Sequence, residues 1–200
     1  MKSTKGVFSK ALIIFVLFSI LTGLIYPALM TGIGQLFFPR QANGSIIEVN
    51  GVKYGSELLG QRYTDPAHMW GRVEAWTTVT DKYGNTLLYA GASNKSPAGE
   101  EMQAAVKERV EKLREADPDM DEKKVPIDLV TGSGSGLDPE ISPAAAEYQV
   151  PRIAEASGKS EDEVRAIVEK CTKGRWLGIF GEPRVNVLKV NLMLDGILTE

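Results

Sequence analysis

The chain has 200 residues with 23 basic and 26 acidic side chains, which gives a net charge of −3 at pH 7. Proteins that bind nucleic acid need a basic surface against the phosphates, so this balance argues against nucleic acid as a partner. Cys171 and His68 are single residues of their types, which excludes an internal disulfide and leaves little material for a zinc site or a Cys/His dyad. We expect Cys171 to pack as a small apolar side chain in a helix.

The first element is an apolar segment, because residues 11–39 carry no charged side chain. A run of about 20 apolar residues is enough to cross the hydrocarbon core of a bilayer. A cleaved signal peptide is the competing interpretation, but its apolar region is typically shorter, and no clear cleavage site follows Pro27. We predict a retained transmembrane helix over 11–31, followed by a linker over 32–44.

Orientation follows from the lysines. Lys2, Lys5 and Lys10 precede the apolar segment, whereas Arg40 is the first basic residue after it. Basic residues are retained on the cytoplasmic side of a span. We therefore predict a protein that crosses the plasma membrane once, with residues 1–10 in the cytoplasm and residues 45–200 outside it.

Small residues recur within this segment. Ser19/Gly23 and Ala28/Gly32 form two small-xxx-small pairs, which allow helices to approach closely in lipid. Glycine and proline are also common in membrane helices without such a role. We favour a helix that packs against a membrane partner through these four residues.

The remaining residues predict a mixture of short strands and helices. Residues 46–54 form two alternating runs around Asn50-Gly51, which is typical of a hairpin, and 55–95 suggest loops and short strands. We predict a strand over 125–130 and a closing strand over 185–194. Helices are expected over 98–116, from Ser142-Pro143 to a bend or break before Pro151, and from the capping box at Ser160 to about residue 172. The predicted fold is an α+β soluble domain anchored by one N-terminal transmembrane helix.

A loop with glycine at every second position follows the predicted strand at Val130. It leaves through a helix start, with Ser142 as N-cap and Pro143 at the first helical position. Such a loop between strand and helix is the context of phosphate-binding loops, although the Lys-Ser/Thr pair of a Walker A motif is absent. A flexible connector is the simpler alternative, but the turn and cap favour a defined shape. Ser133, Gly134, Ser135, Gly136, Asp138 and Ser142 are therefore candidate contacts to a nucleotide or a partner.

Other polar groups offer weaker candidates. Asp117, Asp119, Asp121 and Asp128 match part of a calcium-loop register, but Glu122 stands where that turn needs glycine, so a solvated acidic turn is favoured and no metal is predicted. A Ser/His/Asp set is not credible, because nothing nearby in sequence frames His68. Arg72, Glu182 and Arg184 lie beside Gly or Pro and could form surface ion pairs or partner contacts.

The chain resembles the KdpC family, which belongs to the potassium-transporting Kdp complex, a bacterial P-type ATPase assembly, and it does so over nearly its whole length. The similarity is strongest over Ser133-Gly134-Ser135-Gly136-Leu137-Asp138-Pro139 and Ile141-Ser142-Pro143-Ala144-Ala145-Ala146. It continues through Gln149-Val150, Leu177-Gly178, Gly181-Glu182-Pro183-Arg184-Val185-Asn186-Val187-Leu188, Asn191-Leu192 and Leu194-Asp195.

The resemblance implies a non-catalytic accessory subunit that assembles and activates a high-affinity potassium pump, as a catalytic chaperone that raises the ATP affinity of the hydrolysing subunit. The expected partners are the potassium-translocating and ATP-hydrolysing subunits and the membrane. No cofactor is expected to bind tightly, although ATP is possible through the complex. The alternative is a regulatory subunit whose Gly/Ser loop, with Gln149, contacts ATP directly. Because the lysines place that loop outside the cell, we favour an indirect effect through partner contacts that prefer one transport conformation.

Overall fold

The computed structural model describes residues 4–120 and 123–199 of the chain. It divides after Ile46 into two compact units, which are described separately below. The second unit combines helices with small sheets, so the predicted α+β character of the domain is confirmed.

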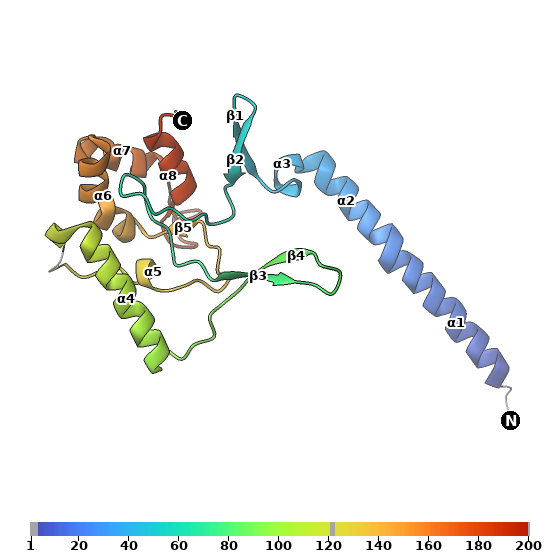
Figure 1. Cartoon of the computed structure of the whole chain (residues 1–200). Helices are drawn as coiled ribbons and strands as arrows, with labels where there is room; N and C mark the ends of the chain where they lie inside the picture. The colour runs from blue at the N-terminus through green and yellow to red at the C-terminus, as the bar shows by residue number, and fades with distance from the viewer. Residues whose placement is uncertain (1–3, 121–122, 200) are drawn as a thin grey trace. The chain divides into compact units, whose positions relative to one another are not determined.

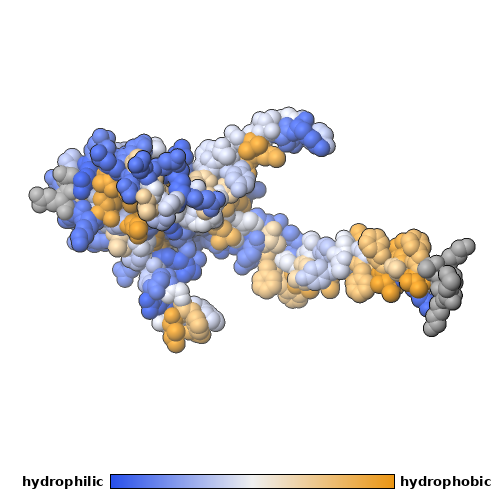
Figure 2. Space-filling view, turned by 90° about the horizontal axis from the view of Figure 1, so that it is seen from below, coloured by the Kyte–Doolittle hydropathy of each residue, from blue (hydrophilic) through white to orange (hydrophobic). Residues whose placement is uncertain are grey.

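The first unit is helical. It contains α1 (Thr4–Ile20), a π-helical turn η1 (Leu21–Ile25), α2 (Tyr26–Phe37) and α3 (Pro39–Ala42) (Figure 1). The π-turn ends two residues before Pro27, which has no N–H to donate to the preceding turn. Sharp changes in a helix are typically found at prolines and π-turns. Residues Gly6–Phe37 form a helix of 32 residues that is long and apolar enough to span a membrane by length and composition. Figure 2 shows hydrophobic residues gathered along this helix.

Two hairpins open the second unit. The pair β1 (Ile46–Val49) and β2 (Val52–Ser56) turns at Asn50 and Gly51, whose φ angles are +53° and +79°, so the predicted Asn-Gly hairpin is confirmed. The pair β3 (Trp76–Thr80) and β4 (Thr86–Ala90) confirms the short strands expected between 55 and 95. Asp81 closes its turn by accepting hydrogen bonds from the backbone N–H groups of Tyr83 and Asn85, both at 2.8 Å, and hydrogen bonds from Asn85 lower the pKa of Asp81.

The core lies among helices and one small sheet. The helical elements are α4 (Glu100–Ala116), η2 (Pro118–Met120), α5 (Ile127–Val130), α6 (Pro143–Ser157), α7 (Glu161–Lys170) and α8 (Val187–Leu194). The sheet has the antiparallel order β5-β7-β6, with β5 (Glu140–Ile141), β7 (Arg184–Asn186) and β6 (Thr172–Lys173). Completely buried side chains include Ala145, Val150, Ile153, Val164 and Val190, so α6, α7 and α8 supply much of the core.

Three predicted elements were wrong. Residues 127–130 form the helix α5, so the expected strand before the glycine loop does not exist. Of the expected C-terminal strand 185–194 only the first two residues are extended, as the end of β7, and α8 follows. A short apolar run does not distinguish a buried strand from a buried helix. Finally, α6 continues through Pro151. Pro151 has no N–H to donate to the carbonyl of Glu147, so one helical hydrogen bond is missing. Glu147 is exposed, so water can bond to that carbonyl in its place.

Two other helices begin at or close to the residues that the sequence predicted. The capping box is present: Ser160 N–H donates to the Glu163 carboxylate at 2.8 Å, and Glu163 N–H donates to Ser160 Oγ at 3.2 Å. The helix predicted over 98–116 begins slightly later, at Glu100, with Gly99 as its N-cap. Cys171 is buried but is the C-cap residue after α7, one position beyond the helix in which it was expected.

Candidate functional site

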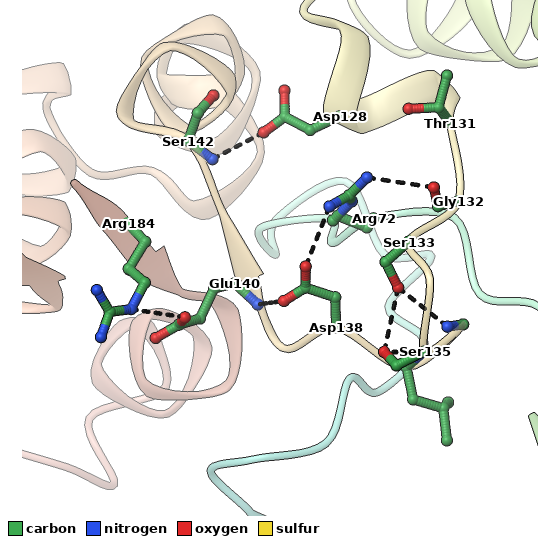
Figure 3. Close-up of polar contacts among 12 residues, drawn as sticks. Arg72, Asp128, Thr131, Gly132, Ser133, Ser135, Asp138, Glu140, Ser142 and Arg184 are labelled. Atoms are coloured by element: carbon green, nitrogen blue, oxygen red, sulfur yellow. Dashed lines mark hydrogen bonds and ion pairs between the residues drawn. The ribbon is translucent and has the colours of Figure 1, made fainter. Parts of the chain in front are cut away.

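The glycine-rich loop satisfies its own polar groups. Ser133 Oγ accepts a hydrogen bond from Gly136 N–H at 3.0 Å, and Ser135 Oγ accepts one from Leu137 N–H at 3.2 Å. The two hydroxyl oxygens lie 3.2 Å apart and turn toward each other (Figure 3). Two of the backbone N–H groups that a phosphate would need are therefore already used inside the loop.

The same loop is a junction for distant backbone segments. Leu137 C=O accepts from Gly60 N–H at 2.8 Å, and Gly136 C=O accepts from Ala75 N–H at 3.0 Å. Gly136 has φ +72°, and a Cβ there would lie 2.6 Å from the carbonyl oxygen of Ala75. Only glycine fits such an approach. A Cβ added at Gly134 would have nothing within 4 Å, so the glycines of this loop have different roles.

Asp138 fixes the exit of the loop. Its Oδ1 accepts from Glu140 N–H at 3.0 Å, while Oδ2 accepts from Arg72 Nη1 at 3.1 Å. Arg72 also donates to the carbonyl of Gly132 at 3.2 Å, so one guanidinium joins the beginning and end of the loop (Figure 3). At the start of α6, Ser142 Oγ accepts from Ala145 N–H at 3.1 Å, which confirms Ser142 as the N-cap.

The residues predicted as partner contacts meet at one groove. Arg72, Glu182 and Arg184 line an open groove of about 610 Å³ together with Asp138 and Ser142. Arg184 Nε pairs with the Glu140 carboxylate at 2.8 Å, and Glu182 pairs with Arg175 at 2.7 Å. The structure thus joins two candidate sets whose members are at least 40 residues apart in sequence.

Gln149 does not belong to this groove. Its side chain is 1% exposed, and its amide accepts from Trp70 N–H at 2.8 Å while donating to Trp70 C=O at 3.0 Å. This paired contact imitates a strand pairing and holds an irregular segment against α6. Gln149 is therefore a structural residue of the core and not part of the loop surface.

Several other buried polar residues, which were not identified from the sequence, also hold backbone segments in place by hydrogen bonds. Asn191 holds the backbone N–H and C=O of Met69 at 2.7 and 3.0 Å, and Asn186 donates to Glu57 C=O at 2.8 Å. The Arg152 guanidinium contacts the carbonyls of Pro66 and His68, and burial lowers its pKa to about 10. Asparagines inside the apolar run 185–194 were the available indication, since a polar residue in a core must be hydrogen-bonded.

The other residues singled out in the sequence are four small residues of the first unit, His68 and the acidic residues after α4. Ser19, Gly23, Ala28 and Gly32 are exposed in the first unit, with nothing within 4 Å of a Cβ added at Gly23 or Gly32. His68 has an acidic partner that is far away in sequence, because its Nε2 lies 2.9 Å from Oδ1 of Asp195. Asp117 is buried, which raises its pKa, so it is not the solvated turn residue we expected, and Asp121 lies outside the described residues.

The site has the chemistry of a contact surface. Within residues 4–120 and 123–199 no group of three or more His, Cys, Asp or Glu side chains is arranged to hold a metal ion. The ordered hydroxyls of Ser133 and Ser135 bind backbone amides and each other. What the arrangement offers is a rigid polar junction beside an ion-paired groove.

Comparison with known proteins assigns the chain to a family. The family model described as K+-transporting ATPase, c chain, matches residues 8–196. A protein of Clostridium botulinum named potassium-transporting ATPase KdpC subunit is 56% identical, with 99% of this chain and 100% of that protein covered. Proteins of the same name from Clostridium perfringens and Methylococcus capsulatus are 54% and 48% identical, with 96% and 95% of this chain and 98% and 97% of those proteins covered.

Proposed function

Because the chain belongs to the KdpC family of potassium-transporting ATPase subunits, we propose that it is a non-catalytic accessory subunit that assembles and activates the pump. The observation that carries this proposal is similarity along almost the entire length of both proteins, apolar helix included. In this role the subunit raises the ATP affinity of the hydrolysing subunit by binding one conformation of the pump more tightly than another.

The sequence itself supports a non-catalytic role. It contains no Asp-Lys-Thr-Gly phosphorylation motif, and the described residues hold one helix suited to crossing a membrane. One span cannot enclose an ion pathway, so translocation and phosphorylation belong to partner subunits. The direct test compares potassium-stimulated ATP hydrolysis of the purified pump with and without this chain across ATP concentrations. An unchanged half-saturating ATP concentration would contradict the chaperone role.

We place the second unit outside the cytoplasm, since Lys2, Lys5 and Lys10 precede the uncharged segment 11–39. Protease added to intact spheroplasts should then degrade the region after Arg40, with a cytoplasmic protein as the control for intactness. Digestion of this region only after lysis would reverse the orientation and bring the Gly/Ser loop to the side where ATP is found.

The first unit is proposed to dock on partner helices through Ser19, Gly23, Ala28 and Gly32, all exposed in the chain by itself. Replacing Gly23 and Gly32 together with leucine should preserve membrane insertion and weaken co-purification with the pump, because bulk holds helix backbones apart. Leucine at Gly6, near the end of the helix, serves as the matched control. Equal yields for all three proteins would contradict close helix packing.

Direct nucleotide binding by the loop remains the alternative function. The hydroxyls of Ser133 and Ser135 accept hydrogen bonds from the loop's own amides, which supports a structural use of the loop over a phosphate cradle. Ser133→Ala should accordingly leave photo-crosslinking of an ATP analogue to the complex unchanged. If Ser133→Ala abolished labelling of this subunit, the nucleotide-binding alternative would be the better account.

A further inference from the structure

A second loop presents large apolar side chains to solvent. Between β6 and β7, the exposed fractions of Trp176, Leu177, Ile179 and Phe180 are 69%, 70%, 74% and 58%. Both flanks are buried, with Cys171 at 6% and Val185 at 0%. Single exposed apolar residues are ordinary, but contiguous ones mark an interaction site.

This apolar loop, residues 174–181, is held in one shape. Trp176 N–H donates to Phe180 C=O at 2.8 Å, and Phe180 N–H donates back to Trp176 C=O at 3.0 Å. The two rings lie 5.7 Å apart, and the Arg175–Glu182 ion pair at 2.7 Å closes the base. The backbone of the loop therefore has its shape before any partner arrives, which reduces the entropic cost of binding.

Leu177 occupies a strained position at the turn. Its φ is +53°, a left-handed conformation that glycine or asparagine adopts more readily than leucine. The core gains nothing from this leucine, because its side chain is 70% exposed. Strained non-glycine residues are concentrated at binding sites, where the side chain has a use that outweighs the strain.

We propose that the apolar loop is a preformed docking element that inserts into an apolar recess on another subunit of the ATPase, with Leu177 at its tip. This inference rests on the proposed function, which supplies the partner. Its base is continuous with the groove described above, since Glu182 belongs to both. A lipid bilayer is the other apolar environment available, but a fluid bilayer accepts any apolar shape. The fixed hairpin and the strain at Leu177 have a use only against a partner of fixed shape.

The first test replaces Leu177 by asparagine. Leu177→Asn removes the apolar contact while suiting the left-handed backbone, so loss of binding is not loss of folding. Leu58→Asn is the matched control, because Leu58 is 56% exposed in a different turn. The full chain in mild detergent is titrated into pump that lacks it, and restored potassium-stimulated ATP hydrolysis is recorded. The half-maximal concentration should rise about tenfold for Leu177→Asn and stay unchanged for Leu58→Asn.

The second test identifies what covers the tip. Leu177→Cys carries an environment-sensitive fluorophore in the full chain, while Cys171 stays unlabelled because it is buried and burial raises the pKa of its thiol to about 11. Lys107→Cys is the solvent-exposed control on α4. A blue shift at position 177 that appears only with the other subunits, without quenching by brominated lipid, is expected. Failure of assembly caused by the label at 177 but not at 107 also supports docking.

Two results of the fluorescence test would overturn the inference. Quenching of position 177 by brominated lipid would assign the loop to the bilayer, and a water-exposed spectrum in the assembled pump would show that nothing covers it. These outcomes are separate from failure of the proposed function. If the unaltered chain did not restore pump activity, the function would be wrong, whereas restoration by Leu177→Asn at the unaltered concentration contradicts docking alone.

Discussion

Two glycine-rich loops of the second unit use glycine for opposite purposes. In the 131–143 loop, Gly136 lets three backbone segments approach, and a Cβ would collide with Ala75 and Gly91 oxygens at 2.6 and 2.7 Å. In the apolar loop, Gly178 and Gly181 have φ of +74° and +79°, with nothing within 4 Å of an added Cβ. The first loop is thus a junction inside the domain, while the second presents its side chains outward.

The difference shows that glycine content alone does not identify a ligand site. The polar loop drew attention as a possible phosphate cradle, yet its hydroxyls and amides bind one another. The apolar loop has no such motif but exposes four large side chains, Trp176, Leu177, Ile179 and Phe180. The two roles are distinguished by whether other backbone segments lie close to the glycine. Substitutions at matched glycines in the two loops test this distinction.

The largest effect is expected at the junction glycine. Gly136→Ala combines a left-handed φ of +72° with backbone collisions, so it should lower the free energy of unfolding by at least about 3 kcal/mol. Gly178→Ala has a similar φ of +74° in open space and should cost about 1 kcal/mol. Urea unfolding of the two variants measures the contrast. Equal losses would mean that φ alone matters and that the junction is not tight.

A smaller loss is expected at the amide that holds Trp70. Gln149→Leu keeps the volume but leaves the Trp70 N–H and C=O unpaired inside the domain, which should cost about 2–3 kcal/mol of unfolding free energy. Gln103→Leu on the exposed face of α4 is the control and should change stability by less than about 0.5 kcal/mol. If Gln149 instead served a ligand, Gln149→Leu would leave the unfolding curve unchanged and affect pump activity only.

The buried thiol of Cys171, which follows α7, predicts a pH dependence. Burial raises the Cys171 pKa from 9.0 to about 11, so the folded chain keeps a proton that the unfolded chain releases. Its stabilisation is complete below pH 9 and is lost as pH rises to about 11, an effect of about 2 kcal/mol. Unfolding free energies of the natural chain and Cys171→Ala, measured between pH 8 and 11, should therefore differ in slope. Parallel curves would show that the thiol is accessible to water.

The smallest effects compare one side chain from each loop. Ser133→Ala removes an acceptor of the Gly136 N–H and should reduce the unfolding free energy by about 1 kcal/mol. Leu177→Asn removes an exposed side chain and relieves a left-handed leucine, so it should raise the unfolding free energy by up to about 1 kcal/mol. Thermal unfolding of both variants under one condition checks the order. A larger loss at Leu177 would show that the apolar loop is part of the core.

The features that depend on neighbours along the chain could be predicted from the amino-acid sequence. Asn50-Gly51 predicted its hairpin, Ser142 and Ser160 predicted their caps, and the residues around the glycine loop predicted the family. Each of these signals acts within a few residues, because a cap or a tight turn is completed by local backbone groups. The apolar helix was equally evident from composition.

Tertiary packing determines which apolar runs are helical and what the polar residues contact. Residues 187–194 and 127–130 form helices in which most apolar side chains are buried, whereas Ile127 is exposed. Periodicity over so few residues cannot distinguish such helices from strands. Gln149 lies within α6 and is buried against Trp70, 79 residues earlier, so it does not line the loop surface with which it was predicted to act. The hydrogen bond between Arg72 and Asp138 likewise joins residues that are 66 positions apart in sequence. Contacts of that range arise when the core brings segments together, so no local pattern in the sequence records them.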